Sequence, residues 1–141
     1  MQAYLQFVVS NPLPFVALVF NVAMIGWVEF SRLTSGVKHL SAGEVVQLMN
    51  RDDAIVLDVR DDAEVREGMI GKPKHIPLAS LGQRLVELDK HRDKTVIAYC
   101  RSGNRSSQAC RMLRKAGFEK VVNLRGGMLA WREANLPVRK R

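Results

Sequence analysis

One short segment combines the residue types needed for nucleophilic chemistry on a small anion. It reads Cys100, Arg101, Ser102, Gly103, Asn104, Arg105, Ser106. An apolar run typical of a buried strand, Thr95 to Tyr99, ends directly before it, and a helical pattern follows it from about Arg105 to Ala116. In open α/β sheets, ligands bind at the carboxyl ends of strands. A loop there can turn several N–H groups inward, and the helix dipole adds positive potential. We therefore predict an anion cradle with Cys100 at its base.

The position of Cys100 indicates a reactive thiol. Unperturbed thiols ionise near about pH 8.5, and helix N-termini and nearby arginines lower that pKa. Arg101 and Arg105 are expected to supply this positive charge, which would make Cys100 a thiolate nucleophile at neutral pH. The alternative, an inert buried thiol, fits a strand–loop junction less well. It fits Cys110, which shares a helical stripe with Leu113 and is predicted to pack in the core.

Composition excludes several other classes of protein. Two cysteines are too few for a disulfide framework or a tetrahedral zinc site, so we expect no metal and no cofactor. The net charge of +8 is concentrated in residues 98–141, where eleven Lys and Arg face two acidic residues. No nucleic-acid motif accompanies these basic residues, so no nucleic-acid partner is expected. Whether this basic third binds anionic lipid or is a solvated face stays open.

The N-terminal segment has the length and polarity of a membrane span. The first 28 residues contain no charged side chain, and about 20 helical residues cover the hydrocarbon thickness. Pro12 suits the first helical position, and Trp27 suits an interfacial anchor. A secretory signal peptide needs a basic start, which Met1 to Phe7 lacks. We expect an N-terminal tail at 1–10, a transmembrane helix at 11–31 and a linker at 32–40.

The flanking charges predict the orientation of this span. Arg32 and Lys38 follow it, whereas no basic residue precedes it. By the positive-inside rule the C-terminal domain lies in the cytoplasm. The chain is then predicted to be a single-pass protein of the cell inner membrane.

The remaining residues, 41–139, alternate between strand and helix patterns. Ser41 and Glu44 form a capping box that opens a helix, and a second capping box is expected at Ser80 and Gln83. Strands are expected at 54–59, 95–99 and 121–124, and helices at about 62–67, 80–88, 105–116 and after 126–127. Such alternation predicts right-handed crossovers and a mainly parallel sheet. The fold class is α/β, with helices flanking the sheet.

The ordered motifs of this region resemble those of the single-domain rhodanese family, in its membrane-anchored bacterial type. They are, in order, Asp58-Val-Arg60, Glu64-x-x-x-Gly68-x-Ile70, Pro77, Cys100-x-x-Gly-x-Arg-Ser, Gly117-Phe118 and Gly126-Gly127-Met-x-x-Trp131. The resemblance covers about residues 40 to 139 and rests on the whole set. Met69 stands where the family often has histidine, in a region that is mainly architectural.

The resemblance implies a ping-pong sulfur transfer through a Cys100 persulfide. Thiosulfate or a persulfide would donate the sulfur, and cyanide, a small thiol or a protein thiol would accept it. Residues 101–106 would bind the anionic donor, while Asp58 and Arg60 would support the site structurally. The physical logic is covalent catalysis in an anion-stabilising cradle.

Two rival functions are considered. Phosphatases and arsenate reductases of this fold place arginine six positions after the cysteine, whereas Arg105 follows Cys100 by five. The shorter loop suits one sulfur atom better than a tetrahedral phosphate. The other rival is a non-catalytic, membrane-tethered module that binds protein partners, although the retention of Cys100 in a cationic loop argues against it.

Overall fold

The chain folds as two compact units, Met1–Gly36 and Val37–Arg141. The computed structural model describes residues 1–34, 36–51 and 53–140, with only the backbone for 32–34. The side chain of Arg32, used above to orient the span, lies outside the described part, as does Arg141. Each unit is described by itself below.

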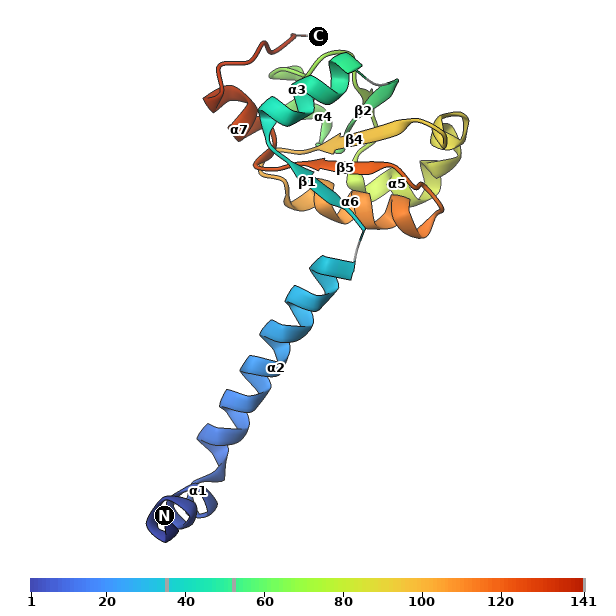
Figure 1. The fold of residues 1–141 in the computed structure, drawn as a ribbon. Helices are drawn as coiled ribbons and strands as arrows, with labels where there is room; N and C mark the ends of the chain where they lie inside the picture. The colour runs from blue at the N-terminus through green and yellow to red at the C-terminus, as the bar shows by residue number, and fades with distance from the viewer. Residues whose placement is uncertain (35, 52, 141) are drawn as a thin grey trace. The chain divides into compact units, whose positions relative to one another are not determined.

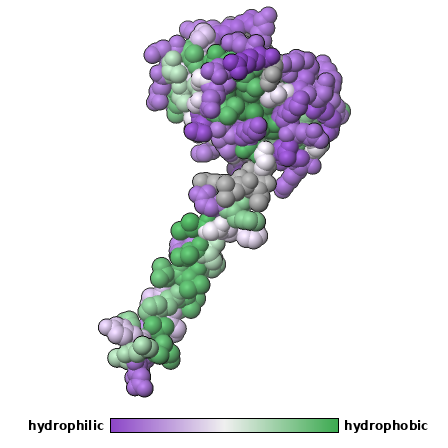
Figure 2. Space-filling view, viewed as in Figure 1, coloured by the Kyte–Doolittle hydropathy of each residue, from purple (hydrophilic) through white to green (hydrophobic). Residues whose placement is uncertain are grey.

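The N-terminal unit consists of two apolar helices, α1 (Gln2–Ser10) and α2 (Pro12–Thr34). Phe7 and Phe15 bring the two helices together through an edge-to-face ring contact at 6.3 Å. Within α2, Pro12–Ser31 is long and apolar enough to cross a membrane, and none of its hydrophobic window is buried inside the structure. Figure 2 shows hydrophobic residues along most of this unit. Its length and apolar composition make α2 a candidate membrane span.

The second unit is built on a five-stranded, wholly parallel sheet in the order β1-β5-β4-β2-β3. Its strands are β1 (Lys38–Leu40), β2 (Ala54–Asp58), β3 (Lys74–His75), β4 (Thr95–Tyr99) and β5 (Val121–Leu124). The helices are α3 (Ala42–Arg51), α4 (Asp62–Arg66), α5 (Leu78–Arg84), η1 (Leu85–His91), α6 (Asn104–Lys115) and α7 (Gly127–Glu133). The parallel sheet flanked by helices is the predicted fold class (Figure 1).

Alternating strand residues feed two apolar cores, one on each face of the sheet. Val96 and Ala98 pack toward α5, η1 and α6 in one core, and Ile97 and Tyr99 pack toward α3 and α7 in the other. Both faces of the central strands are therefore covered, as their nearly continuous apolar sequence predicts. Cys110 is fully buried in the first core, which confirms its packing role.

Three local predictions were wrong or incomplete. Residues 38–40, expected in the linker, form strand β1, which pairs in parallel with β5. The Ser80 capping box is wrong, because α5 begins two residues earlier at Leu78, and the Ser80 N–H bonds to the Pro77 carbonyl. The helix expected over 80–88 changes at Leu85 into the 3₁₀ helix η1. The Ser41–Glu44 capping box is confirmed by two reciprocal hydrogen bonds.

Candidate active site

The segment from Cys100 to Ser106 lies where β4 ends and α6 begins. Gly103 takes the left-handed conformation, with φ of 97°, and caps the helix N-terminus. This turn brings the Gly103 N–H to 3.1 Å from Cys100 Sγ and the Ser106 hydroxyl to 3.4 Å from it. Cys100 is 1% exposed, so its sulfur lies at the base of the turn. The predicted turn is therefore present, and its N–H and hydroxyl groups form a cradle around the Cys100 sulfur; that the cradle binds an anion stays a prediction.

The cradle favours the ionised form of the Cys100 thiol. Burial raises the pKa of Cys100, since a charge is disfavoured in an apolar surrounding. Hydrogen bonds from the Ser106 hydroxyl and from the backbone N–H groups of Ser106, Gly103 and Ser102 lower it by more, so the pKa falls below its ordinary value. At Cys110 burial is the main influence, and it raises the pKa of that thiol to about 12. The pKa values of the two cysteines thus shift in opposite directions, because the hydrogen bonds that lower the pKa of Cys100 do not act on Cys110.

The start of α7 holds the opposite side of the turn. The Cys100 carbonyl accepts a hydrogen bond from the Met128 N–H at 2.8 Å, and the Arg101 carbonyl accepts one from Leu129 at 3.1 Å. Gly127, with φ of 55°, allows this approach, because a Cβ there would collide with the Cys100 carbonyl. These backbone contacts explain why the Gly126-Gly127 motif belongs to the site although it lies far along the chain.

Asn123 and the Gly103 carbonyl fix the orientation of the Ser106 side chain. Its hydroxyl lies 2.6 Å from Asn123 Oδ1 and 3.2 Å from the Gly103 carbonyl. The Asn123 amide in turn donates to the Gly103 carbonyl at 3.3 Å and lies 3.0 Å from His39 Nδ1. Strands β1 and β5 therefore support the turn through side chains, and this support ties the orientation of Ser106 to the sheet.

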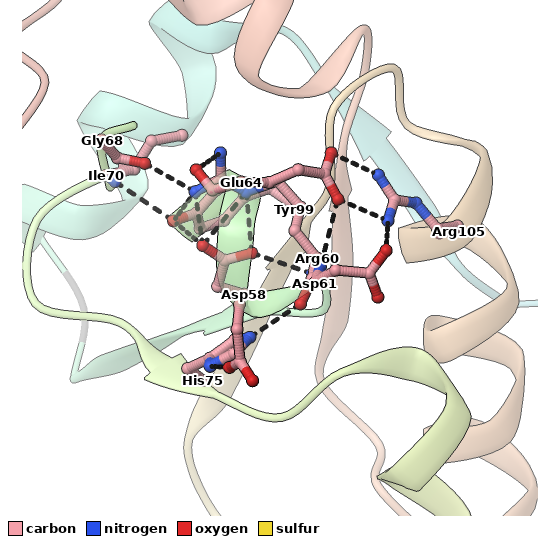
Figure 3. Close-up of polar contacts among 10 residues, drawn as sticks. Asp58, Arg60, Asp61, Glu64, Gly68, Ile70, His75, Tyr99 and Arg105 are labelled. Atoms are coloured by element: carbon pink, nitrogen blue, oxygen red, sulfur yellow. Dashed lines mark hydrogen bonds and ion pairs between the residues drawn. The ribbon is translucent and has the colours of Figure 1, made fainter. Parts of the chain in front are cut away.

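Asp58 and Arg60 form a buried ion pair beside Tyr99 (Figure 3). The Arg60 guanidinium donates to both Asp58 oxygens, the shortest contact being 2.6 Å, and to the Gly68 carbonyl at 2.7 Å. The Tyr99 hydroxyl donates to Asp58 Oδ2 at 2.6 Å and accepts from the Ile70 N–H at 3.2 Å. The network joins the end of β4 to the loop after α4, and the structural role expected for Asp58 and Arg60 stays a prediction.

The Asp58 carboxylate raises the pKa of two neighbouring groups, Tyr99 and Arg60. Burial and the Asp58 carboxylate raise the pKa of Tyr99, so the phenol stays protonated. Burial would lower the pKa of Arg60, but its hydrogen bonds to Asp58 raise it by more. Arg60 therefore stays a cation, and the tyrosine beside it stays neutral.

Arg105 is paired with carboxylates from the other side of the site. Its two terminal nitrogens donate to Glu64 at 2.7 and 2.8 Å, and one of them lies 3.5 Å from Asp61 Oδ2 (Figure 3). Hydrogen bonds from Arg105, opposed by burial, lower the pKa of Glu64 to about 2. The same bonds raise the pKa of Arg105, and the negative charges of Glu64, Cys100 and Asp61 add to this. The positive charge expected from Arg105 is thus largely compensated, and hydrogen bonds are the main contributors to the low pKa of Cys100.

The residues predicted to form the site differ in how deeply they are buried in the turn. Gly103 and Ser106 are buried against the sulfur, while Arg101, Ser102 and Asn104 are exposed on the outer side. Arg105 is partly buried between them and α4.

Sequence reasoning missed the roles of Asn123, Tyr99 and Asp61. Asn123 sits in a buried strand, and a polar residue in an apolar run could have indicated a buried hydrogen bond. Asp61 with Glu64 is a capping-box pattern, and both hydrogen bonds of that box are present in α4. Nothing in the sequence indicates that Glu64 also binds Arg105, 41 positions away.

Comparison with known proteins agrees with this geometry. The profile of the rhodanese-like domain matches residues 41–134. The uncharacterized protein YibN of Escherichia coli (strain K12) is 35% identical over 98% of this chain and 97% of its own length, so the match includes the apolar helices. A sulfurtransferase of Allochromatium vinosum is 41% identical over 65% of this chain and 84% of its own. The crystal structure of a rhodanese-related protein from Thermoplasma volcanium superimposes with a TM-score of 0.67 at 30% identity, covering 74% of this chain and 99% of its own.

Proposed function

Because the chain belongs to the rhodanese-like domain family, we propose that it is a sulfurtransferase that carries a sulfane sulfur as a persulfide on Cys100. Its relatives include a protein named as a sulfurtransferase, and its parallel sheet is that of the family. The observation that carries the proposal is the environment of one sulfur atom. Cys100 Sγ receives the Gly103 N–H and the Ser106 hydroxyl at the N-terminus of α6.

In the first half-reaction the Cys100 thiolate attacks the outer sulfur of the donor. With thiosulfate, a sulfur–sulfur bond forms at Cys100, the donor's S–S bond breaks, and sulfite leaves with the electron pair. In the second half-reaction cyanide or a thiolate attacks the outer sulfur of the persulfide, and the S–S bond to Cys100 breaks. The product is thiocyanate or a new persulfide, and Cys100 returns to the thiolate. Cys100 is a persulfide, at the oxidation level of a disulfide, after the first half-reaction and a thiolate again after the second, so the full cycle needs no oxidant or reductant beyond the donor and the acceptor.

The residues of the turn have distinct roles in this scheme. The Gly103 and Ser102 N–H groups and the Ser106 hydroxyl stabilise the thiolate, and the N–H groups of the turn would stabilise the persulfide anion in the same way. Arg101, Asn104 and Arg105 contact the donor or the acceptor at the rim. Asp58 and Arg60 hold the loop after α4 in place.

We also propose that α2 anchors the domain in the cell inner membrane as a single pass, with the sheet domain in the cytoplasm. The support is the uncovered apolar helix Pro12–Ser31 and the match of YibN along the same segment. Membranes from cells producing the full chain should retain it after carbonate washing. Protease added to spheroplasts should leave the sheet domain intact. Digestion of the sheet domain by external protease contradicts the orientation.

Two cysteine variants test the enzymatic proposal. Cys100→Ser in the full chain should abolish the formation of thiocyanate from thiosulfate and cyanide, while its thermal unfolding stays close to that of the wild type. Cys110→Ala is the matched control, since Cys110 is buried and its thiol is kept protonated. Thiocyanate formation by the Cys100→Ser variant contradicts the proposal.

A further inference from the structure

The rim of the Cys100 site carries less positive charge than its arginines suggest. Arg105 makes two hydrogen bonds to Glu64 and a longer ion pair to Asp61, so one guanidinium faces two carboxylates. Figure 3 shows these three side chains meeting, with Glu64 and Asp61 both supplied by the start of α4. The Asp61 side chain is 76% exposed, whereas that of Glu64 is 22% exposed. The partly buried member of the group is thus the one that binds Arg105 most closely.

This arrangement matters for the charge of the sulfur donor. Thiosulfate is a dianion, and its approach to the Cys100 thiolate brings three negative charges together. Opposite charges must offset that repulsion, and a site lined by one sign of charge attracts only ligands of the other sign. Arg105 cannot fully neutralise the charge of a dianion while it is paired with Glu64 and Asp61. An organic persulfide, R–S–SH, carries at most one negative charge on its sulfur group and needs less compensation.

We propose that the Glu64–Arg105 pair makes the Cys100 site selective for organic persulfides over dianionic donors, so that Glu64 determines which class of donor is used. This inference rests on the proposed sulfurtransferase function and concerns the same site. Glu64 acts through Arg105 and is not itself in contact with Cys100 in any hydrogen bond that the structure describes. It is a specificity-determining residue.

The transfer from an organic persulfide is balanced without a further reagent. The Cys100 thiolate attacks the outer sulfur of R–S–SH. A bond forms between Cys100 Sγ and that sulfur, and the S–S bond of the donor breaks. The thiolate R–S⁻ leaves with the electron pair, and the transferred sulfur keeps its proton until solvent removes it. Cys100 becomes Cys–S–SH, one thiolate is exchanged for another, and no oxidant or reductant is consumed.

Glu64→Gln tests the proposal most sharply. Glutamine keeps the length of the side chain and suits the capping box with Asp61, but it removes the charge that compensates Arg105. Two donors are compared on the full chain with a common acceptor, cyanide: thiosulfate, and the persulfide of N-acetylcysteine methyl ester, whose organic part is uncharged. The measured quantity is the ratio of kcat/KM for the two donors. This ratio cancels changes in folding or in the ionised fraction of Cys100, because both donors meet the same enzyme.

In Glu64→Gln, kcat/KM for thiosulfate should rise about tenfold at low salt, within the range that charge in a cleft exerts on encounter rates. For the persulfide of N-acetylcysteine methyl ester, kcat/KM should change less than about threefold. Added salt should reduce the increase in kcat/KM for thiosulfate. Asp61→Asn keeps a good helix N-cap and should move the ratio in the same direction by a smaller factor. Glu119→Gln changes the net charge equally, away from the site, and should leave the ratio as in the wild type.

An unchanged donor ratio in both Glu64→Gln and Asp61→Asn overturns the selectivity proposal and leaves the sulfurtransferase proposal standing. A ratio that shifts equally in Glu119→Gln also overturns it, because net charge and not the pair is then responsible. If neither donor transfers sulfur to Cys100 in the wild-type chain, the proposed function fails, and this inference fails with it.

Discussion

Replacing Ser106 with alanine removes the side-chain hydrogen bond to the candidate nucleophile, together with the contacts of the same hydroxyl to Asn123 and to the Gly103 carbonyl. The Ser106 hydroxyl lies 3.4 Å from Cys100 Sγ. Its hydrogen bond is the largest of the contributions that lower the pKa of Cys100, whereas burial raises that pKa. A hydrogen bond to a charged group contributes about 1.5–3 kcal/mol. The long separation favours the lower end of that range. About 1.4 kcal/mol corresponds to a factor of ten in the ionisation equilibrium. At a pH below the pKa of both thiols, the ionised fraction of Cys100 should therefore be roughly tenfold smaller in Ser106→Ala than in the wild type.

The assay is the rate of Cys100 alkylation by iodoacetamide as a function of pH, followed by intact mass. Ser106→Ala should be about threefold slower than the wild type near neutral pH, because the thiolate of higher pKa regains part of the loss as a stronger nucleophile, and it should be the faster of the two at high pH, where both thiols are ionised. Ser106→Thr keeps the hydroxyl and is the matched control. Equal rates for the wild type and Ser106→Ala at every pH refute the reasoning. A uniform loss at all pH values refutes it too, because it reports a distorted site.

Three further predictions concern the groups around the turn. Asp58→Asn breaks the buried pair with Arg60 and should lower the free energy of unfolding by about 3–5 kcal/mol in urea titrations; a loss below about 1 kcal/mol contradicts the assigned pairing. The folded pKa of Glu64, about 2, lies below its ordinary 4.5, so its pair with Arg105 stabilises the fold above about pH 4.5, and this contribution disappears as the pH falls toward 2. The difference in unfolding free energy between the wild type and Glu64→Gln should shrink over that window, and a difference independent of pH argues against the pair. Gly127→Ala should cost more than about 1 kcal/mol in stability and slow thiol alkylation, since a side chain there meets the backbone of the turn; wild-type values for both measurements contradict that contact.

Patterns of short range predicted most of the fold. The apolar runs before Asp58 and Cys100 predicted buried strands, and Ser41 with Glu44 predicted a helix start, because each depends on neighbours within a few residues. Strand β1 was missed because three residues carry little periodicity, and its pairing with β5 depends on residues more than 80 positions away. The Ser80 capping box failed because the chain enters α5 through Pro77, and tertiary packing moved the helix start.

The candidate site divides in the same way. The type and spacing of residues predicted the cradle, since the strand, turn and helix that form it are contiguous in sequence. The compensation of Arg105 by Glu64 was not predicted, because the two residues lie on different elements and meet only when β2 and β4 pair. The support of Ser106 by Asn123 likewise depends on the register of β4 with β5.

The most direct test of the account is the intact mass of the full chain after treatment with a sulfur donor and removal of the excess. The wild type and Cys110→Ala should gain the mass of one sulfur atom, peptide mapping should place that atom on Cys100, and cyanide should remove it with the release of thiocyanate. A chain whose Cys100 gains no sulfur from either thiosulfate or an organic persulfide contradicts the account.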